Sequence, residues 1–332
     1  MSRDMIMDIV RLVLYVACLV GFAAFNAAYL SLLERKLPSW MQLRRGPTEV
    51  GPWGLLQPVA DGLKLLSKQI LIPQGADVLL FRLAPVMVAV PGILCLVTIP
   101  FSETIAARNF NLGLLMIFSF GAINVFAVML GGWASNNKYS SIAAARVVAQ
   151  NIAYEIPLLL VVISLVMSMH TFNLHTIVDQ QAGGFWHWNI LALKVSPMMP
   201  IAFLIYFTCM LAETNRAPFD MVEAESELVA GAFTEYSGMG FGLFFIAEYV
   251  NIIVGSCVGT ILFLGGWDSP FGFLPGLHWF LLKMYALSFA VIWVRWSFPR
   301  TQFYGLLNLS WKILIPLALV NLVLTAIMLK LF

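Results

Sequence analysis

The sequence predicts an all-α polytopic membrane protein with about eight transmembrane helices and an amphipathic surface helix in its first inner loop. Its 332 residues have a mean hydropathy of +0.88, and 61% of them are hydrophobic whereas 11% are charged. A water-soluble domain carries roughly 25% charged residues, so we expect lipid to surround most of this chain. We expect a single transmembrane domain over residues 1–332.

Eight apolar segments supply the expected helices, since a spanning helix needs about 20 apolar residues. They cover residues 12–33, 83–101, 112–135, 147–169, 190–212, 239–264, 277–296 and 313–329. The first segment is too long for the apolar core of a cleaved signal peptide, and no small-residue cleavage site follows it. We therefore expect this segment to be retained as a helix.

Basic residues are shared unevenly between the two sides of the expected bundle. With the amino terminus outside, twelve of the 19 Lys and Arg residues fall inside, and seven fall outside or at helix margins. The inside set is Arg35, Lys36, Arg44, Arg45, Lys64, Lys68, Arg82, Lys138, Arg146, Arg216, Arg295 and Arg300. The positive-inside rule then predicts both termini outside and the long loops 34–82 and 213–238 in the cytoplasm. We expect the location to be a bacterial inner membrane.

The first inner loop contains an amphipathic pattern over residues 54–70, GLLQPVADGLKLLSKQI. Asp61, Lys64 and Lys68 share one helical face, and the leucines lie largely on others. Pro58 is expected in the first turn. Such a helix lies on a membrane surface or docks beneath another subunit. A local helix that packs on its own protein remains the alternative.

Carboxylates concentrate in the second long loop and the helix after it. Seven of the 17 acids lie between residues 213 and 248: Glu213, Asp220, Glu223, Glu225, Glu227, Glu235 and Glu248. In a helix, Asp220, Glu223 and Glu227 would share one face. Carboxylates that close disfavour one another's ionisation, so such groups can hold and release protons. The alternative is a solvated acidic loop whose charges repel.

Two acids lie inside apolar segments. Glu155 and Glu248 fall roughly 14–18 Å from the inner face at about 1.5 Å per residue. A carboxylate exposed to lipid there costs at least ~2.5 kcal/mol, and such residues usually serve a proton or ion path. Pro157 frees a backbone carbonyl beside Glu155, where water is expected. Glu34 and Glu213 lie at the inner ends of their helices. Together, these acids predict a row of carboxylates from the inner surface to the middle of the membrane. A purely structural role for buried acids is the alternative.

Metal and nucleic-acid sites are not expected in this chain. The cysteines (Cys18, Cys95, Cys209, Cys257) and histidines (His170, His175, His187, His278) lack metal-ligand spacing. The net charge of +2 and the lack of a basic tract argue against nucleic acid. Any redox chemistry is therefore expected in partner subunits.

Four long blocks of this sequence resemble one family. They are LLERKLPSWMQLRRGPTEVGPWGLLQPVADGLKLLSK, SNNKYSSIAAARVVAQNIAYEIPLLL, AETNRAPFDMVEAESELVAGAFTEYSGMGFGLFFIAEY and WKILIPLALVNLVLT. They are similar to the inner loops and the fourth, sixth and last helices of the subunit 1 family, the quinone-chamber membrane subunits of respiratory complex I (proton-translocating NADH:quinone oxidoreductase). The resemblance runs through nearly the whole chain.

The resemblance implies a translocase subunit that binds no cofactor itself. Quinone is the substrate of the complex, and its tail enters between this subunit's helices and the amphipathic loop helix. The headgroup is reduced in the peripheral-arm subunits. FMN and iron–sulfur clusters lie in partner subunits of this chain. Carboxylates of this subunit begin a chain of polar residues that leads past small membrane subunits to antiporter-like ones.

Matching the motifs assigns two sets of site residues. The predicted proton relay comprises Glu34, Glu155, Glu213, Asp220, Glu223, Glu225, Glu227, Glu235 and Glu248. The predicted quinone chamber and docking surface comprise Arg35, Arg44, Arg45, Asp61, Lys64 and Arg216. The arginines can balance the acids or hold docked subunits; simple positive-inside anchoring is the alternative.

Three other functions compete with the quinone-linked one. The membrane subunit of an energy-converting hydrogenase shares the acid-bearing helices but needs no quinone, and the complete RRGP–GLLQPVADGLKLL loop favours the quinone branch. A standalone ion transporter would not need so large a polar inner loop. A structural anchor would tolerate replacement of the membrane acids.

Overall fold

The computed structural model describes residues 3–192, 196–222, 228 and 230–331. Within these residues the chain is helical and has no strand. Seven of the described helices are long and apolar enough to cross a membrane. They are α1 (Arg3–Met41), α3 (Val78–Thr98), α4 (Gly113–Ala134), α5 (Lys138–Met169), α9 (Gly238–Phe263), α10 (Leu277–Ser297) and a last helix made of α11 (Phe303–Leu309), a π-helical turn (Ser310–Leu314) and α12 (Ile315–Leu331). With the shorter apolar helix α7 (Met199–Glu213), the predicted fold class is confirmed.

Several predicted helix boundaries are wrong. The helices expected to begin at residues 83, 147 and 313 begin earlier, at Val78, Lys138 and Phe303, because polar residues extend them beyond the apolar segment. The helix expected over residues 190–212 begins only at Met199, because Pro200 stands in its first turn and a proline suits a helix start rather than an interior. Residues 189–191 form a separate short 3₁₀ turn. The first helix does not end at residue 33 but continues to Met41. Glu34 therefore lies inside a helix, where Leu32 and Leu37 on the same helix are buried.

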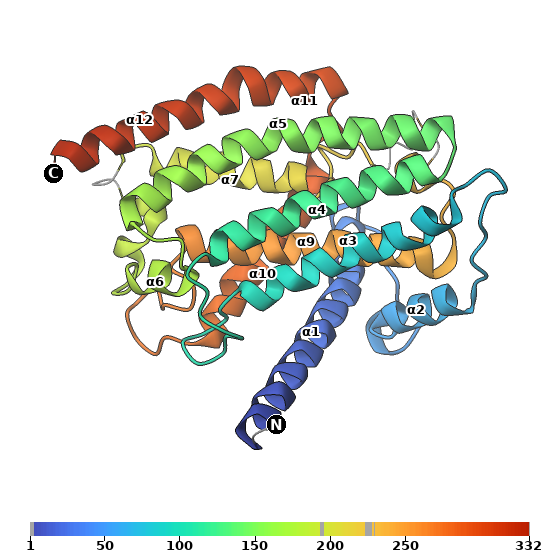
Figure 1. Cartoon of the computed structure of the whole chain (residues 1–332), viewed down its shortest axis with the longest axis horizontal. Coiled ribbons are helices and arrows are strands. Elements are labelled where there is room, and N and C mark those ends of the chain that lie inside the picture. The colour runs from blue at the N-terminus through green and yellow to red at the C-terminus, as the bar shows by residue number, and fades with distance from the viewer. Residues whose placement is uncertain (1–2, 193–195, 223–227, 229, 332) are drawn as a thin grey trace.

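Helix α9 is the centre of the bundle. Two-thirds (67%) of its most apolar window is buried within the chain, the largest share of any candidate span. It packs against α1, α3, α7 and α10, while α5 packs against α4, α7 and α12 (Figure 1). Small residues allow close approach: a Cβ at Gly132 of α4 would lie 2.4 Å from Ala144 of α5.

One end of the bundle collects the long connections, and we call it the loop end. It contains residues 42–77 and the described residues of the segment 214–237, where α1 and α7 finish and α3 and α9 begin. Ser140 at the start of α5 donates to the carbonyl of Ala232 at 2.8 Å, and Thr301 donates to Pro218 at 2.9 Å. Thus segments distant in sequence form one hydrogen-bonded layer.

The amphipathic helix is α2 (Gln57–Ser67), which lies at the loop end with Pro58 in its first turn (Figure 1). Arg35 of α1 binds Asp61 of α2 at 2.7 Å, and α2 also contacts α9. Its apolar side is largely open, with exposed Val59, Leu63 and Leu66, and the flanking Leu55, Leu56 and Ile70 are exposed as well. The helix packs on its own chain and also presents an uncovered apolar face, so contact of that face with a membrane or another subunit stays a prediction.

At the opposite end, Lys283 of α10 closes the end of α9. Its buried ammonium donates to the carbonyls of Leu264, Gly266 and Asp268 at 2.6, 3.0 and 2.6 Å. The ammonium also lies 4.1 Å from the centre of the Trp188 ring. These contacts satisfy an otherwise costly buried charge and hold the segment that directly follows α9.

Candidate functional site

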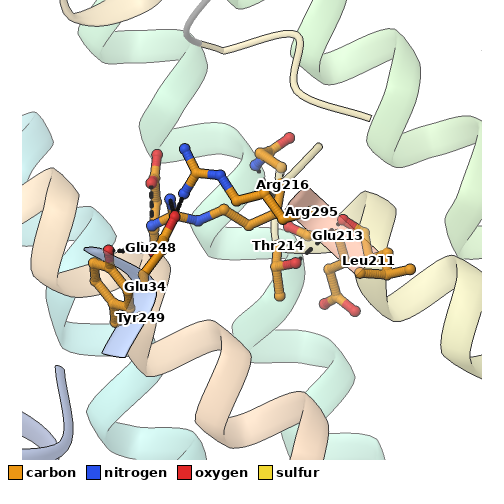
Figure 2. Close-up of polar contacts among 9 residues, drawn as sticks. Glu34, Leu211, Glu213, Thr214, Arg216, Glu248, Tyr249 and Arg295 are labelled. Carbon is orange, nitrogen blue, oxygen red and sulfur yellow. Dashed lines mark hydrogen bonds and ion pairs between the residues drawn. The ribbon is translucent and has the colours of Figure 1, made fainter. Parts of the chain in front are cut away.

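A buried ion-pair network joins four parts of the chain at the loop end (Figure 2). Arg216, just after α7, binds Glu34 of α1 at 3.2 Å and Glu248 of α9 at 3.1 Å. Arg295 of α10 forms a second ion pair with Glu34. The hydroxyl of Tyr249 donates to the other oxygen of Glu34 at 2.5 Å. Two carboxylates and two guanidinium groups thus balance each other's charge.

Burial makes this balance necessary. Glu34, Arg216 and Glu248 are only 5%, 3% and 8% exposed. A charge at such a position needs an opposite charge and hydrogen bonds, and removal of one partner from a buried pair costs about 3–5 kcal/mol. The Arg216 guanidinium also lies 4.6 Å from the centre of the Tyr249 ring, a cation–π contact.

The end of α7 directs Arg216 into the network. Asn215 has a left-handed backbone (φ 51°), which Asn tolerates and which commonly ends a helix. The following segment is held by Gln150 of α5, which is fully buried. Its side-chain amide donates to the carbonyls of Ala212 and Phe219 at 2.7 and 2.8 Å. Arg216 therefore projects from a fixed turn.

A cavity of about 450 Å³ adjoins the network. We call it the basic cavity, because five arginines line it. Its lining residues are Ser31, Glu34, Arg35, Pro38, Arg44, Arg45, Gly46, Pro47, Arg216, Phe245, Tyr249, Arg295 and Trp296. The volume falls within the ~300–1,000 Å³ that small-molecule sites occupy. Aromatic and basic walls suit a flat ring system that becomes anionic.

The other membrane acids lie apart from these arginines. Glu155 of α5 and Glu213 of α7 line a cavity of about 20 Å³, which we call the Glu155 cavity. Within the described residues neither carboxylate forms an ion pair. Glu213 is exposed and Glu155 half-exposed on the isolated chain. Gly121 of α4 makes room here, since a Cβ on it would lie 3.3 Å from the Glu213 carboxylate.

A second small cavity shares Glu213 with the Glu155 cavity and extends to α9. The Asn251 cavity, of about 40 Å³, is lined by Glu213, Thr214, Asn124 and Asn251 among others. Thr214 is two residues before Arg216, and Asn251 is three residues after Glu248 on α9. About 10–15 Å³ accommodates one water, so each of the two small cavities has room for at least one.

Two asparagines support hydration of these cavities. Asn151 lines the Glu155 cavity and is 6% exposed, and Asn124 lines the Asn251 cavity. The side-chain oxygen of each is buried and has no hydrogen-bond partner in the described part of the chain. An unsatisfied buried oxygen is costly, and water is its natural partner.

The remaining predicted residues lie elsewhere. Arg35, Arg44 and Arg45 line the basic cavity, and Asp61 adjoins it through Arg35. Lys64 is exposed on α2 and is not part of the cavity wall.

Among the predicted loop acids, Glu235 accepts a hydrogen bond from Asn137 at 2.6 Å, beside the start of α5. Asp220 lies half-buried in an irregular segment. Glu223, Glu225 and Glu227 lie outside the described residues, as does the helical face expected for them.

Sequence reasoning missed Arg295, Tyr249, Asn124 and Asn151. Arg295 looked like an ordinary basic residue at a helix end. Tyr249 adjoins Glu248, but spacing alone does not predict that both reach the surroundings of Glu34. The intramembrane asparagines were a usable signal, because polar side chains at that depth usually face a water-filled interior.

Comparison with known proteins identifies the family. A family model described as NADH dehydrogenase matches residues 14–326. A protein of Desulfotalea psychrophila, named as a subunit of NADH-quinone oxidoreductase, is 58% identical over 316 residues, which cover 94% of this chain and 95% of that protein. Proteins of the same name from Burkholderia vietnamiensis and Burkholderia ambifaria are each 47% identical over 299 residues, covering 88% of this chain and 84% of each relative. This chain therefore belongs to the NADH dehydrogenase family, as the resemblance of its loop and helix motifs predicted.

Proposed function

We propose that this chain is the membrane subunit of a proton-pumping NADH:quinone oxidoreductase. It lines the quinone chamber and couples quinone reduction to proton translocation. The names of its relatives support the complex. One structural observation supports the coupling role: the basic cavity adjoins a charge-balanced network, and two small cavities that share Glu213 reach Glu155 and, through Asn251, the helix that carries Glu248.

The first step is reduction of the quinone headgroup in the peripheral-arm subunits that adjoin the basic cavity. Quinone accepts two electrons from the iron–sulfur clusters of partner subunits, with two protons needed to form the quinol. As electrons arrive, negative charge develops beside arginines that also neutralise Glu34 and Glu248. The positive charge of those arginines then stabilises the reduced quinone as well as the two carboxylates. Glu34 and Glu248 lose counter-charge and take up protons in response.

The next steps pass through the small cavities. A proton moves from the Glu248 region along water in the Asn251 cavity to Glu213, and along water in the Glu155 cavity to Glu155. Two carboxylates that line one small space disfavour simultaneous ionisation, so this pair is suited to carrying one proton. The open side of the Glu155 cavity faces a neighbouring membrane subunit of the complex, which continues the path.

Partners cover the surfaces that this chain leaves open. The apolar face of α2 borders the membrane and the quinone tail's entry, and the loops 34–82 and 213–238 dock the quinone-reducing peripheral arm in the cytoplasm. Asp220, Glu223, Glu225, Glu227 and Glu235 belong to that docking loop and feed protons to the relay. Both termini face outward from a bacterial inner membrane, and small and antiporter-like membrane subunits flank the helices. FMN and the iron–sulfur clusters belong to the partners.

Isolation of the native complex tests this function. The subunit is tagged and extracted in mild detergent, and the isolated complex is assayed for NADH-driven quinone reduction. We expect activity together with flavin and iron–sulfur partners in one fraction. Electron supply from hydrogen without a quinone requirement would instead assign the chain to an energy-converting hydrogenase. Ion flux through the purified chain alone would assign it to a transporter, and full pumping without the membrane acids would reduce it to an anchor.

A further inference from the structure

Helix α5 carries Glu155 through the bundle with a proline inside it. Pro157 has no N–H, so the carbonyl of Ala153, four residues earlier, loses its helical partner. Ala153 is 2% exposed, and an unsatisfied carbonyl is costly inside a membrane protein. The sequence suggested water at this point, but the last helix supplies the partner instead.

Ser310 fills the vacated position. Its hydroxyl donates to the Ala153 carbonyl at 2.5 Å, and its side chain is fully buried. Ser310 is the first residue of the π-helical turn Ser310–Leu314, where the last helix runs alongside α5 (Figure 1). Single π-helical turns are rare and occur frequently at functional sites.

A second hydrogen bond runs in the opposite direction. The hydroxyl of Tyr154 on α5 donates to the Leu306 carbonyl of the last helix at 3.2 Å. The two residues directly before Glu155 are thus both held by the last helix, one through its carbonyl and one through its side chain. Tyr154 and Glu155 also line the same cavity as Glu213.

We propose that Ser310 is a positioning residue for Glu155. By satisfying the carbonyl that Pro157 leaves free, Ser310 fixes the turn of α5 from which the Glu155 carboxylate faces the Glu155 cavity. Loss of the hydroxyl releases that turn, admits water to the Ala153 carbonyl and moves the carboxylate relative to Glu213. This inference rests on the proposed role of Glu155 in the proton relay.

The chain offers a matched control for ordinary helix packing. Asn321 of α12 donates to Ser164 of α5 at 2.9 Å, which is another fully buried hydrogen bond between the same helices. Ser164 lies nine residues beyond Glu155, or about 14 Å along the helix at ~1.5 Å per residue. If Ser310 only joins two helices, its loss should resemble loss of Ser164.

The test uses the whole complex reconstituted in liposomes with a quinone, and compares Ser310→Ala, Ser310→Thr and Ser164→Ala. The readouts are protons translocated per NADH and the pH profile of coupled turnover. For Ser310→Ala we expect at least a two-fold loss of protons per NADH and a shift of the profile by about one pH unit. Ser310→Thr keeps the hydroxyl and should match the wild type, and Ser164→Ala should leave both readouts unchanged.

A second, independent test restores the N–H that Pro157 lacks. In a Pro157→Ala background the Ala153 carbonyl regains a helical partner, so Ser310→Ala should add little further change in the pH profile. Ser310→Cys keeps the side-chain size with a weaker donor, and it replaces Ser310→Ala if that variant fails to assemble. Its expected profile lies between those of Ser310→Ala and the wild type.

Glu155→Gln separates the two levels of inference. If it abolishes pumping while Ser310→Ala behaves like Ser164→Ala, the positioning role is overturned and the relay stands. An equal effect of Ser310→Ala in the proline and alanine backgrounds also overturns the positioning role. If Glu155→Gln leaves pumping unchanged, the relay role of Glu155 fails, and the role of Ser310 fails with it.

Discussion

The ion-pair network and the Glu155 cavity contain the same kind of acid in opposite surroundings. Glu34 and Glu248 are buried and matched by Arg216 and Arg295. Glu155 and Glu213 have no ion pair within the described chain and are partly open at its surface. The network pairs its charges inside this chain, whereas the described chain supplies no counter-charge to the cavity pair. Substitutions in the network should therefore lower stability, whereas substitutions in the Glu155 cavity should impair proton transfer.

The largest expected effect comes from removing a cation of the network. Arg216→Leu deletes the guanidinium that binds both Glu34 and Glu248, and loss of one partner of a buried pair costs about 3–5 kcal/mol. We expect little assembled complex in membranes, measured by native electrophoresis and thermal inactivation. Arg216→Lys should retain a substantial part. Normal assembly of Arg216→Leu would show that the network is not a stability element.

An acid of the Glu155 cavity should behave in the reverse way. Glu213→Gln strands no opposite charge within the described chain, so the assembled amount should match the wild type. Loss of its proton-carrying group should lower coupled quinone reduction about ten-fold or more. Glu103→Gln, an exposed acid at the opposite end of the bundle, is the control and should be silent. If Glu213→Gln also lost assembly, the proposed difference between a stabilising network and a proton-carrying cavity pair would be wrong.

Hydration of the Glu155 cavity predicts a smaller effect. Asn151→Leu removes the buried side-chain oxygen and fills the space, so water is excluded and protons pumped per NADH should fall several-fold. Asn26→Leu is the matched control. Its amide is already bonded to Phe22 and Tyr285, so its loss should lower thermal stability without changing that ratio. Unaltered pumping in Asn151→Leu would exclude a water path through this cavity.

The smallest effect is expected at the edge of the basic cavity. Arg35 and Asp61 form an ion pair between side chains that are 46% and 32% exposed. Pairs of this kind contribute roughly 0.2–1 kcal/mol and weaken with salt. Asp61→Asn should leave assembly intact and raise the apparent KM for quinone modestly at low salt, with the difference vanishing at high salt. A large effect that persists at high salt would give Asp61 a place in the relay instead.

Sequence patterns determined much of this fold, and the errors have physical causes. Apolar length predicted the spans, and amphipathic spacing with Pro58 predicted α2. The charged run after residue 33 hid the continuation of α1, because hydropathy does not register a helix that leaves the membrane. Pro200 delayed α7 for a local reason that apolar length alone overlooks.

The site was predictable by residue type but not by partnership. Glu34, Glu155, Glu213 and Glu248 were all expected from their depth or helix position. Their division into two groups was not, since the contact between Arg216 and Glu34 joins residues 182 apart in sequence. The partner of the carbonyl freed by Pro157 lies 157 residues away from it. Such contacts follow from helix packing, which spacing along one chain does not specify.

Helix α9 is held at two points, by Lys283 on carbonyl groups directly after its last residue and by Arg216 on Glu248, near its middle. A rod anchored in this way transmits little displacement along its axis. A change in the quinone chamber should consequently travel past α9 as redistributed charge and shifted hydrogen bonds rather than as a sliding helix. We expect any movement in α5, where a hydrogen bond from the Ser310 hydroxyl replaces the helical one lost at Pro157. The bundle thus combines a fixed central helix with one less rigid member, and Glu155 lies on the less rigid one.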